Sequence, residues 1–431
     1  MNMKLKKCSF KFIETSLMAL LSSTAIASDL PASVSDRYIA LGIEHAQSDN
    51  INKSSVNKES GHEQSIDLSL GYFNQTATNL TALDYTISYS TYSDDETDDE
   101  TDDESDISGS LNLSQEIFSK NLMLNLSHFR RSYLLDQSSS DVPENSGDRD
   151  VFTINPVWII PYSKRAGFQL SYNYIATRLS DNDDDDTDRN IIGLAWYHKL
   201  NTKTRFELSS DMSDVEYRNT GADYQKINVN ASIEGQLVAG TYLVQLGYSK
   251  LSDDDSDETG AIFKLAYQYQ FAKHNLSLSA ERELSDSSLG LGNDVADNEN
   301  EDFSDSQLLW IDRIQLDHKF IITSRLNNNN NIYYQQEKDL NTDEKDPRWG
   351  LGTGFDFKNT EKLNSFVSLQ YSESTLVSDF DKQITNAIIG AKYLLRPRLS
   401  FSLQAEYEKQ STASISSYDE MRYTARIEFR N

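Results

Sequence analysis

The stretch LTALDYTISYSTY, residues 80–92, alternates apolar and polar side chains along its whole length. One face carries Leu83, Tyr85, Ile87 and Tyr89, and the other carries Asp84, Thr86, Ser88 and Ser90. Successive side chains of a β-strand point to opposite faces, so this stretch predicts a strand with one apolar and one polar face. Residues 65–74, 226–237 and 399–408 repeat the pattern.

The connections between these segments alternate between short turns and long polar loops. Nine short turns and ten long loops separate segments of about 10–13 residues, from which we expect about 18–20 strands in one meander. A soluble sandwich or propeller uses shorter strands and usually more Gly and Pro than the 18 Gly and 6 Pro found here. A transmembrane strand needs about 9–11 residues. The pattern therefore predicts an all-β fold, a single transmembrane antiparallel up-and-down β-barrel. The barrel must be closed, because a sheet in lipid cannot leave the backbone groups of an edge strand unpaired.

The N-terminal residues have the pattern of a secretory signal peptide. A basic segment with Lys4, Lys6 and Lys7 precedes an apolar stretch, and residues 25–27 (Ala-Ile-Ala) match a cleavage site. The alternative is an N-terminal membrane anchor. We expect a signal peptide over residues 1–27, a short periplasmic segment over 28–36 and the barrel over 37–431, with no plug domain. Cys8 is the only cysteine, so the mature chain would lack disulfides and thiol chemistry.

Four acidic runs together carry as many negative charges as the formal net charge of the chain. Residues 93–106, 181–188, 252–259 and 285–306 contain 28 Asp and Glu and no Lys or Arg, in a chain of formal net charge −28. All four fall in long loops, whereas many Lys and Arg lie at the short turns. The charge therefore predicts a barrel with an acidic end and a basic end. It also argues against nucleic-acid binding, which needs a basic surface.

At this point the chain resembles Gram-negative outer-membrane β-barrel proteins of the porin-like kind. The last segment strengthens the resemblance, because Tyr423, Ala425, Ile427 and Phe429 alternate and end in an aromatic, as in the C-terminal strand that the outer-membrane assembly machinery reads. Arg430 and Asn431 depart from the pattern by following that aromatic. The resemblance implies a place in the cell outer membrane, contact with lipopolysaccharide, short turns in the periplasm and acidic loops outside the cell.

The polar faces of the predicted strands should line the lumen. Strand parity places thirteen acids and six bases on these faces. An acidic lumen attracts cations electrostatically, and the alternative is that these charges pair and only support the wall. The candidate selectivity residues are Asp67, Asp84, Glu116, Glu207, Asp211, Glu234, Glu281, Arg313, Asp317 and Asp356.

No cofactor is expected, although closely spaced carboxylates suit hard cations. The acidic runs lack the glycine and distant glutamate of an EF-hand, so the main interpretation is a solvated, self-repelling loop and the second is weak Ca²⁺ or Mg²⁺ binding. The candidate ligands are Asp183, Asp184, Asp185, Asp186, Asp253, Asp254 and Asp255.

The chain lacks the G-x-S-x-G and H-E-x-x-H motifs, and we do not expect an enzyme. One constellation stays open, because His45 and His62 flank one loop and Glu44 and Glu63 adjoin them.

The five asparagines 327–331 occupy a predicted strand and would place Asn328 and Asn330 on the lipid face. Either that strand is short, or it is bulged, or its outer face meets a neighbouring protomer. The hypothesis that fits the whole pattern best is a channel for passive passage of small hydrophilic solutes with a preference for cations. The alternatives are an export or assembly barrel for a polysaccharide and a surface interaction protein that uses its acidic loops.

Overall fold

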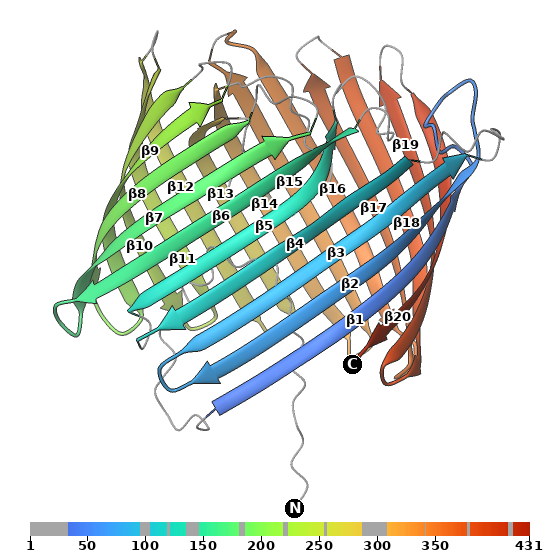
Figure 1. Ribbon diagram of the computed structural model, residues 1–431, viewed down its shortest axis with the longest axis horizontal. Coiled ribbons are helices and arrows are strands. Elements are labelled where there is room, and N and C mark those ends of the chain that lie inside the picture. Colours follow the sequence, from blue (N-terminus) through green and yellow to red (C-terminus); the bar gives the residue numbers. More distant parts are fainter. Residues whose placement is uncertain are drawn as a thin grey trace, which may run out of the picture.

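The computed structural model forms one continuous barrel (Figure 1). It describes residues 33–94, 104–118, 121–134, 146–180, 186–218, 223–253, 257–286, 308–340, 342–376, 380–412 and 417–431. The predicted signal peptide and the greater part of the acidic runs lie outside these ranges.

Twenty strands make up the barrel. They are β1 Ser33–Ser48, β2 Gly61–Thr76, β3 Leu80–Asp94, β4 Glu104–Ile117, β5 Leu122–Leu134, β6 Ser146–Pro161, β7 Ala166–Leu179, β8 Thr187–Lys199, β9 Thr204–Tyr217, β10 Tyr224–Leu237, β11 Gly240–Asp253, β12 Asp257–Phe271, β13 His274–Asp286, β14 Leu308–Thr323, β15 Leu326–Asp339, β16 Lys345–Lys358, β17 Leu363–Leu376, β18 Phe380–Arg396, β19 Leu399–Thr412 and β20 Tyr418–Arg430.

Each strand pairs antiparallel with its neighbours in the sequence, and β1 pairs with β20 to close the sheet. The predicted all-β up-and-down barrel is therefore confirmed, at the upper end of the expected strand number. Among the described residues, no helix is long and apolar enough to cross a membrane.

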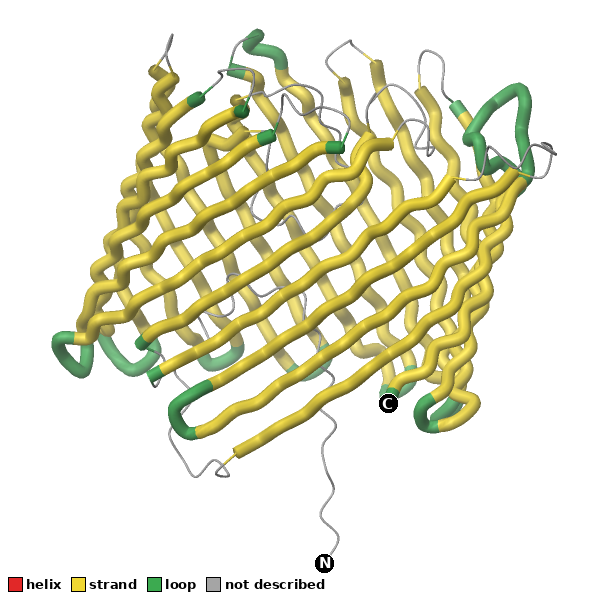
Figure 2. The backbone as a smooth tube through the Cα atoms, viewed as in Figure 1, coloured by secondary structure: helices red, strands yellow, loops and turns green. Residues whose placement is uncertain are grey.

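The short connections gather at one rim, and the strand ends that lead into the longer connections lie at the opposite rim (Figure 2). We call these the short-turn rim and the long-loop rim. The strands run 13–17 residues, longer than the 10–13 expected from alternation. Ladder pairing continues past the apolar segments, because backbone hydrogen bonds do not require an apolar side chain. The predicted loop 252–259 is therefore shorter than expected, with Ser252 paired to Asp257. For the same reason β1 begins at Ser33, inside the segment expected to precede the barrel.

The apolar face of each strand points away from the lumen. Ile43, Ile192 and Leu246 are 57%, 60% and 61% exposed, and they belong to a belt of exposed apolar side chains that surrounds the barrel. A soluble protein rarely exposes an apolar surface of this extent. The belt is therefore the surface that faces lipid.

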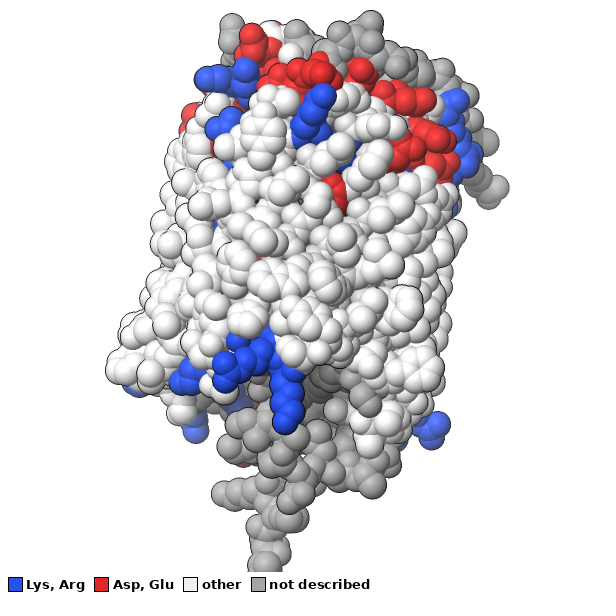
Figure 3. Space-filling view, turned by 90° about the vertical axis from the view of Figure 1, so that its left-hand side faces the viewer, with Lys and Arg blue, Asp and Glu red and all other residues white. Residues whose placement is uncertain are grey.

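Charges frame this belt. On the face drawn in Figure 3, Asp and Glu gather at the long-loop rim, Lys and Arg stand out at the short-turn rim, and uncharged residues fill the space between. The described residues thus have the two-ended charge distribution that the sequence predicts.

The strand number sets the width of the barrel. Twenty strands spaced about 4.8 Å apart and tilted by about 40° give a circumference of about 125 Å and a backbone diameter of about 40 Å. Inward side chains narrow this bore, and 16–18-stranded barrels already enclose an aqueous channel.

Candidate functional site: the lumen and its vestibule

The predicted selectivity residues fall on the strand face opposite the lipid belt. Asp67, for example, lies between Ile66 and Leu68 on β2, and Ile66 is an exposed residue of the belt. The same parity applies to the other members of the set, whose strands are β3 for Asp84, β4 for Glu116, β9 for Glu207 and Asp211, β10 for Glu234, β13 for Glu281, β14 for Arg313 and Asp317, and β16 for Asp356.

Several of these acids are ion-paired to a neighbouring strand. Across the seam that closes the barrel, Arg426 on β20 lies 3.2 Å from Glu44 and 2.6 Å from Asp67. On β9 and β10, Arg205 pairs with Glu207 and lies 3.7 Å from Glu234. These pairs lie along the inner wall, within one strand or between strands at most two apart.

A longer polar ladder crosses β12 to β16. Glu281 lies 2.8 Å from Lys264 and 3.5 Å from Arg313. The ladder continues as the Arg313 Nε donates to Gln335 at 2.8 Å and the Gln335 amide donates to Glu337 at 2.8 Å. It ends at Arg348 on β16, 3.7 Å from Glu337.

Four of the remaining acids accept hydrogen bonds from neutral donors. The Tyr38 hydroxyl donates to Asp84 at 2.6 Å, and the Asn329 amide donates to Asp356 at 2.8 Å. Asn228 donates to Asp211 at 2.8 Å, and Gln315 donates to Asp317 at 3.0 Å. Such donors orient a carboxylate and leave its charge in place.

Parity analysis missed a set of inward arginines near the strand ends. Extending the alternation two to four residues past each apolar segment would have found them, because Arg205 alternates with Glu207 and Arg422 alternates with Arg426. The same extension adds inward acids beside them, such as Glu63 at Arg422 and Glu337 at Arg348, so these arginines do not remove the acidic excess expected of the lumen. The set comprises Arg149, Arg189, Arg205, Arg348 and Arg422.

The hairpin ends of β13 and β14 bend into the lumen at the long-loop rim. Pairing between β12 and β13 stops at Phe263 and Arg282, whereas β13 and β14 stay paired up to Asp286 and Leu308. Trp310 is on the same side of β14 as the exposed Ile314, yet it is only 4% exposed. We call this segment, residues 282–286 with 308–312, the inner arm.

The contacts of the inner arm place it against the inner face of β10 to β12. The Trp310 indole donates to Glu258 on β12 at 3.2 Å, and Lys226 on β10 donates to the Leu284 carbonyl at 2.9 Å. The Arg282 guanidinium lies 4.9 Å from the centre of the Trp310 ring. An outward residue of β14 can reach an inward residue of β12 only if the arm lies inside the wall.

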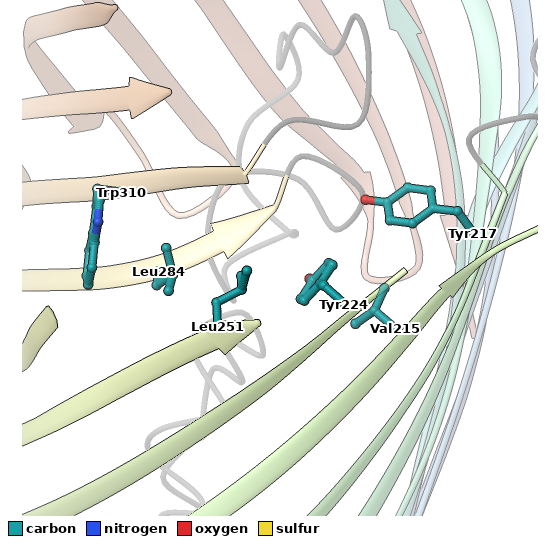
Figure 4. Packing of buried hydrophobic residues seen from close by; sticks show 6 residues of the cluster. All are labelled: Val215, Tyr217, Tyr224, Leu251, Leu284 and Trp310. Atoms are coloured by element: carbon teal, nitrogen blue, oxygen red, sulfur yellow. The ribbon is translucent and has the colours of Figure 1, made fainter. Parts of the chain in front are cut away.

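An apolar cluster holds the inner arm in place (Figure 4). Leu284 and Trp310 from the arm join side chains from β9 to β11, and all six members are at most 5% exposed. Burying two large side chains in this way contributes on the order of 4 kcal/mol to holding the arm against the wall. The partners on the wall are Val215, Tyr217, Tyr224 and Leu251.

The loop of residues 49–60 also turns toward the lumen. Lys53 lies 3.5 Å from Glu408 on β19 and 5.5 Å from the centre of the Tyr418 ring. Lys58 pairs with Asp419 at 2.8 Å, and that hydrogen bond raises the pKa of Lys58. This loop and the inner arm, on different sectors of the rim, define a vestibule at the long-loop end.

The histidine constellation is not assembled. The rings of His45 and His62 are 5.9 Å apart, but both lie on the lipid side of their strands. Glu44 points to the opposite side and pairs with Arg426, and Glu63 pairs with Arg422. Sequence proximity suggested a cluster that the pleat of the strands separates.

The metal hypothesis rests largely outside the described residues, since Asp183, Asp184, Asp185, Asp254 and Asp255 are not among them. Asp186 lies 3.6 Å from Arg178 and 3.7 Å from Arg218, so two cations face it. Asp253 is the last residue of β11. Within the described ranges, no group of three or more His, Cys, Asp or Glu could hold a metal ion.

Comparison with solved structures agrees with the architecture. The siderophore receptor PirA from Acinetobacter baumannii matches with a TM-score of 0.54 at 11% identity, over 92% of this chain and 80% of that one. This protein has the fold of an outer-membrane β-barrel. A ferric enterobactin receptor (PfeA) mutant from Pseudomonas aeruginosa matches with a TM-score of 0.53 at 9% identity, over 92% and 80% of the two chains.

OpdK from Pseudomonas aeruginosa, crystallised with vanillate, matches with a TM-score of 0.44 at 10% identity, over 92% and 99% of the two chains. No protein-family model matches the sequence. A search of curated proteins finds no significant match.

Proposed function

We propose that this outer-membrane barrel is a channel for passive passage of small hydrophilic solutes, with a preference for cations. The observation that carries the proposal is a closed wall of twenty strands whose inner face is polar and charged. A bore of about 40 Å between backbones leaves room for water after the inward side chains are added. Water-filled barrels of this kind conduct ions and small solutes.

The proposed cation preference rests on the inward acids whose hydrogen-bond donors are uncharged. Asp84 bonds to Tyr38 and Asp356 bonds to Asn329, so each adds a negative charge to the lumen wall. Both lie near the short-turn rim, four and two residues from the ends of their strands. By contrast, Lys264 and Arg313 offset the charge of Glu281, whereas Arg426 and Arg205 each offset only one of the two carboxylates beside them.

Planar-bilayer recording tests the proposal. The purified protein should conduct, and its reversal potential in a KCl gradient should have the sign of a cation-preferring pore. The double variant Asp84→Asn with Asp356→Asn should keep the conductance and shift the reversal potential toward zero, because it removes charge without changing side-chain size.

A matched control is Asp214→Asn on β9. Asp214 accepts a hydrogen bond from the Gln225 amide at 3.2 Å but lies on the outer side of the wall. This variant should leave the reversal potential unchanged. A folded barrel that never conducts would refute the channel, and a conducting barrel with anion preference would refute the role of the acids.

A further inference from the structure

A polar patch interrupts the lipid-facing belt on β13 to β16. Asn328 and Asn330 lie on the same side of β15 as Ile332, which is 55% exposed to the exterior. His318 on β14 and Thr353 on β16 are the register partners of Asn330. His274 on β13, the partner of Phe320, completes the patch. The strand is not short, and β15 keeps its register with β16 throughout, while its register with β14 shifts once, at Ile321/Thr323 beside Asn327.

The patch lies inside the apolar belt. The next outward pair of β15 and β16 toward the short-turn rim is Leu326 with Phe357. The next outward pair toward the long-loop rim is Ile332 with Leu351. Successive outward residues are two positions apart on a strand that rises about 3.3 Å per residue and is tilted by about 40°. Each row of outward residues is therefore about 5 Å from the next along the membrane normal. Asn330 is therefore about 10 Å from the row of Leu326, at a depth where lipid offers no hydrogen-bond partner.

The polar groups bond to one another in part. The Thr353 hydroxyl donates to Asn330 at 2.8 Å, and the Asn330 amide donates to Asn328 at 2.6 Å. The Asn328 amide donates to the Gly354 carbonyl at 3.0 Å. The ring nitrogens Nδ1 of His274 and Nε2 of His318 lie 3.1 Å apart.

This network leaves bonding capacity unused. An asparagine amide nitrogen carries two N–H donors, and among the described residues the Asn330 nitrogen donates one hydrogen bond. Burying such a group in hydrocarbon costs several kcal/mol unless another protein surface satisfies it.

We propose that this patch is the contact surface between two copies of the chain, related by a two-fold axis along the membrane normal. An amide is both donor and acceptor, so the patch complements a copy of itself. The outward positions of both polar rows on β13 to β16 contain no Lys, Arg, Asp or Glu, so a charged partner gains nothing there. A second copy supplies neutral donors and acceptors flanked by the same apolar rows.

Site-directed cross-linking in membranes tests the contact. In a Cys8→Ser background, Thr353→Cys treated with a short thiol-to-thiol cross-linker should yield a species of twice the monomer mass. The control is Val229→Cys, which is outward and 56% exposed but lies on β10, far around the wall. It should stay monomeric.

A second arm removes the complementarity. Adding Asn328→Val and Asn330→Val to the Thr353→Cys protein should lower the cross-linked fraction by about tenfold, the effect of losing one or two hydrogen bonds between copies. Mass measurement of the unaltered protein in lipid nanodiscs gives a readout that needs no variant, and it should show a dimer. A monomer there, an unchanged fraction in the valine variant, or cross-links to another protein alone would each overturn the proposal. The Asp84→Asn with Asp356→Asn variant tests the channel and does not alter this contact, so each proposal can fail without the other.

Discussion

Arg426 is the cation with the most carboxylate partners at the seam between β20, β1 and β2. It holds Glu44 at 3.2 Å and Asp67 at 2.6 Å, and its side chain is one-third exposed. Arg426→Gln would leave two neighbouring carboxylates without their cation. We expect it to lower the free energy of unfolding by about 2 kcal/mol, less than for a fully buried pair because water reaches the lumen.

Urea titration of the protein in lipid vesicles measures this loss. Lys392→Gln is the control, because Lys392 makes one pair with Glu428 at 2.9 Å and is 49% exposed. It should cost about 0.5 kcal/mol or less. Equal losses for the two variants would contradict a special role for the seam.

For single residues, the sequence predicts which face of the wall a side chain is on, but it does not predict which residue that side chain contacts. Alternation alone places Asp67 and Asp84 on the lumen face, because a strand offers a side chain only two sides. It cannot tell that Asp67 pairs with Arg426 and that Asp84 accepts a hydrogen bond from Tyr38. The Asp67–Arg426 pair depends on closure, which joins residues more than 300 positions apart, and the Asp84–Tyr38 bond depends on the register of β1, β2 and β3.

The inner arm is the element whose position depends most on tertiary contacts. Trp310 joins it to the wall through packing and through one hydrogen bond to Glu258. Trp310→Ala removes both, and loss of a buried Trp costs about 3 kcal/mol. Amide protection from hydrogen exchange over residues 308–312 should therefore fall by about a hundredfold.

Trp158→Ala is the matched control. Trp158 lies on β6 and is 55% exposed toward lipid, so it makes no contact with the arm. Protection over residues 308–312 should stay as in the unaltered protein. A Trp310→Ala protein with full protection there would show that the cluster does not hold the arm.

Alternation in the sequence could not reveal the arm. Trp310 and Leu284 fit the outward phase of their strands, as lipid-facing residues would. These side chains are buried because β13 separates from β12 beyond Arg282. The apolar face of the inner arm, which would otherwise face lipid, then packs against Leu251 and Tyr224. Alternation therefore predicts that a side chain has nonpolar surroundings, but it does not distinguish lipid from an apolar cluster inside the barrel.

The whole barrel sets how far wall charges act on the solution inside it. In a bore of about 40 Å, a wall carboxylate influences ions only within a Debye length, about 10 Å at 0.1 M salt and about 3 Å at 1 M. The cation preference should therefore decline as KCl rises from 0.1 M to 1 M. Reversal potentials at a constant concentration ratio measure this decline, and a preference that persists at 1 M would indicate a constriction far narrower than the bore.

The sequence by itself determined the strand pattern, the two faces and the two ends of this barrel. Those features follow from the two-residue period of a strand and from the need to separate apolar, polar and charged groups among lipid, lumen and rim. Only the tertiary structure decided which inward acids are neutralised, which hairpin enters the lumen and which polar groups meet on the outer wall. Those outcomes depend on register between strands and on closure of β20 against β1, and local alternation carries no information about either.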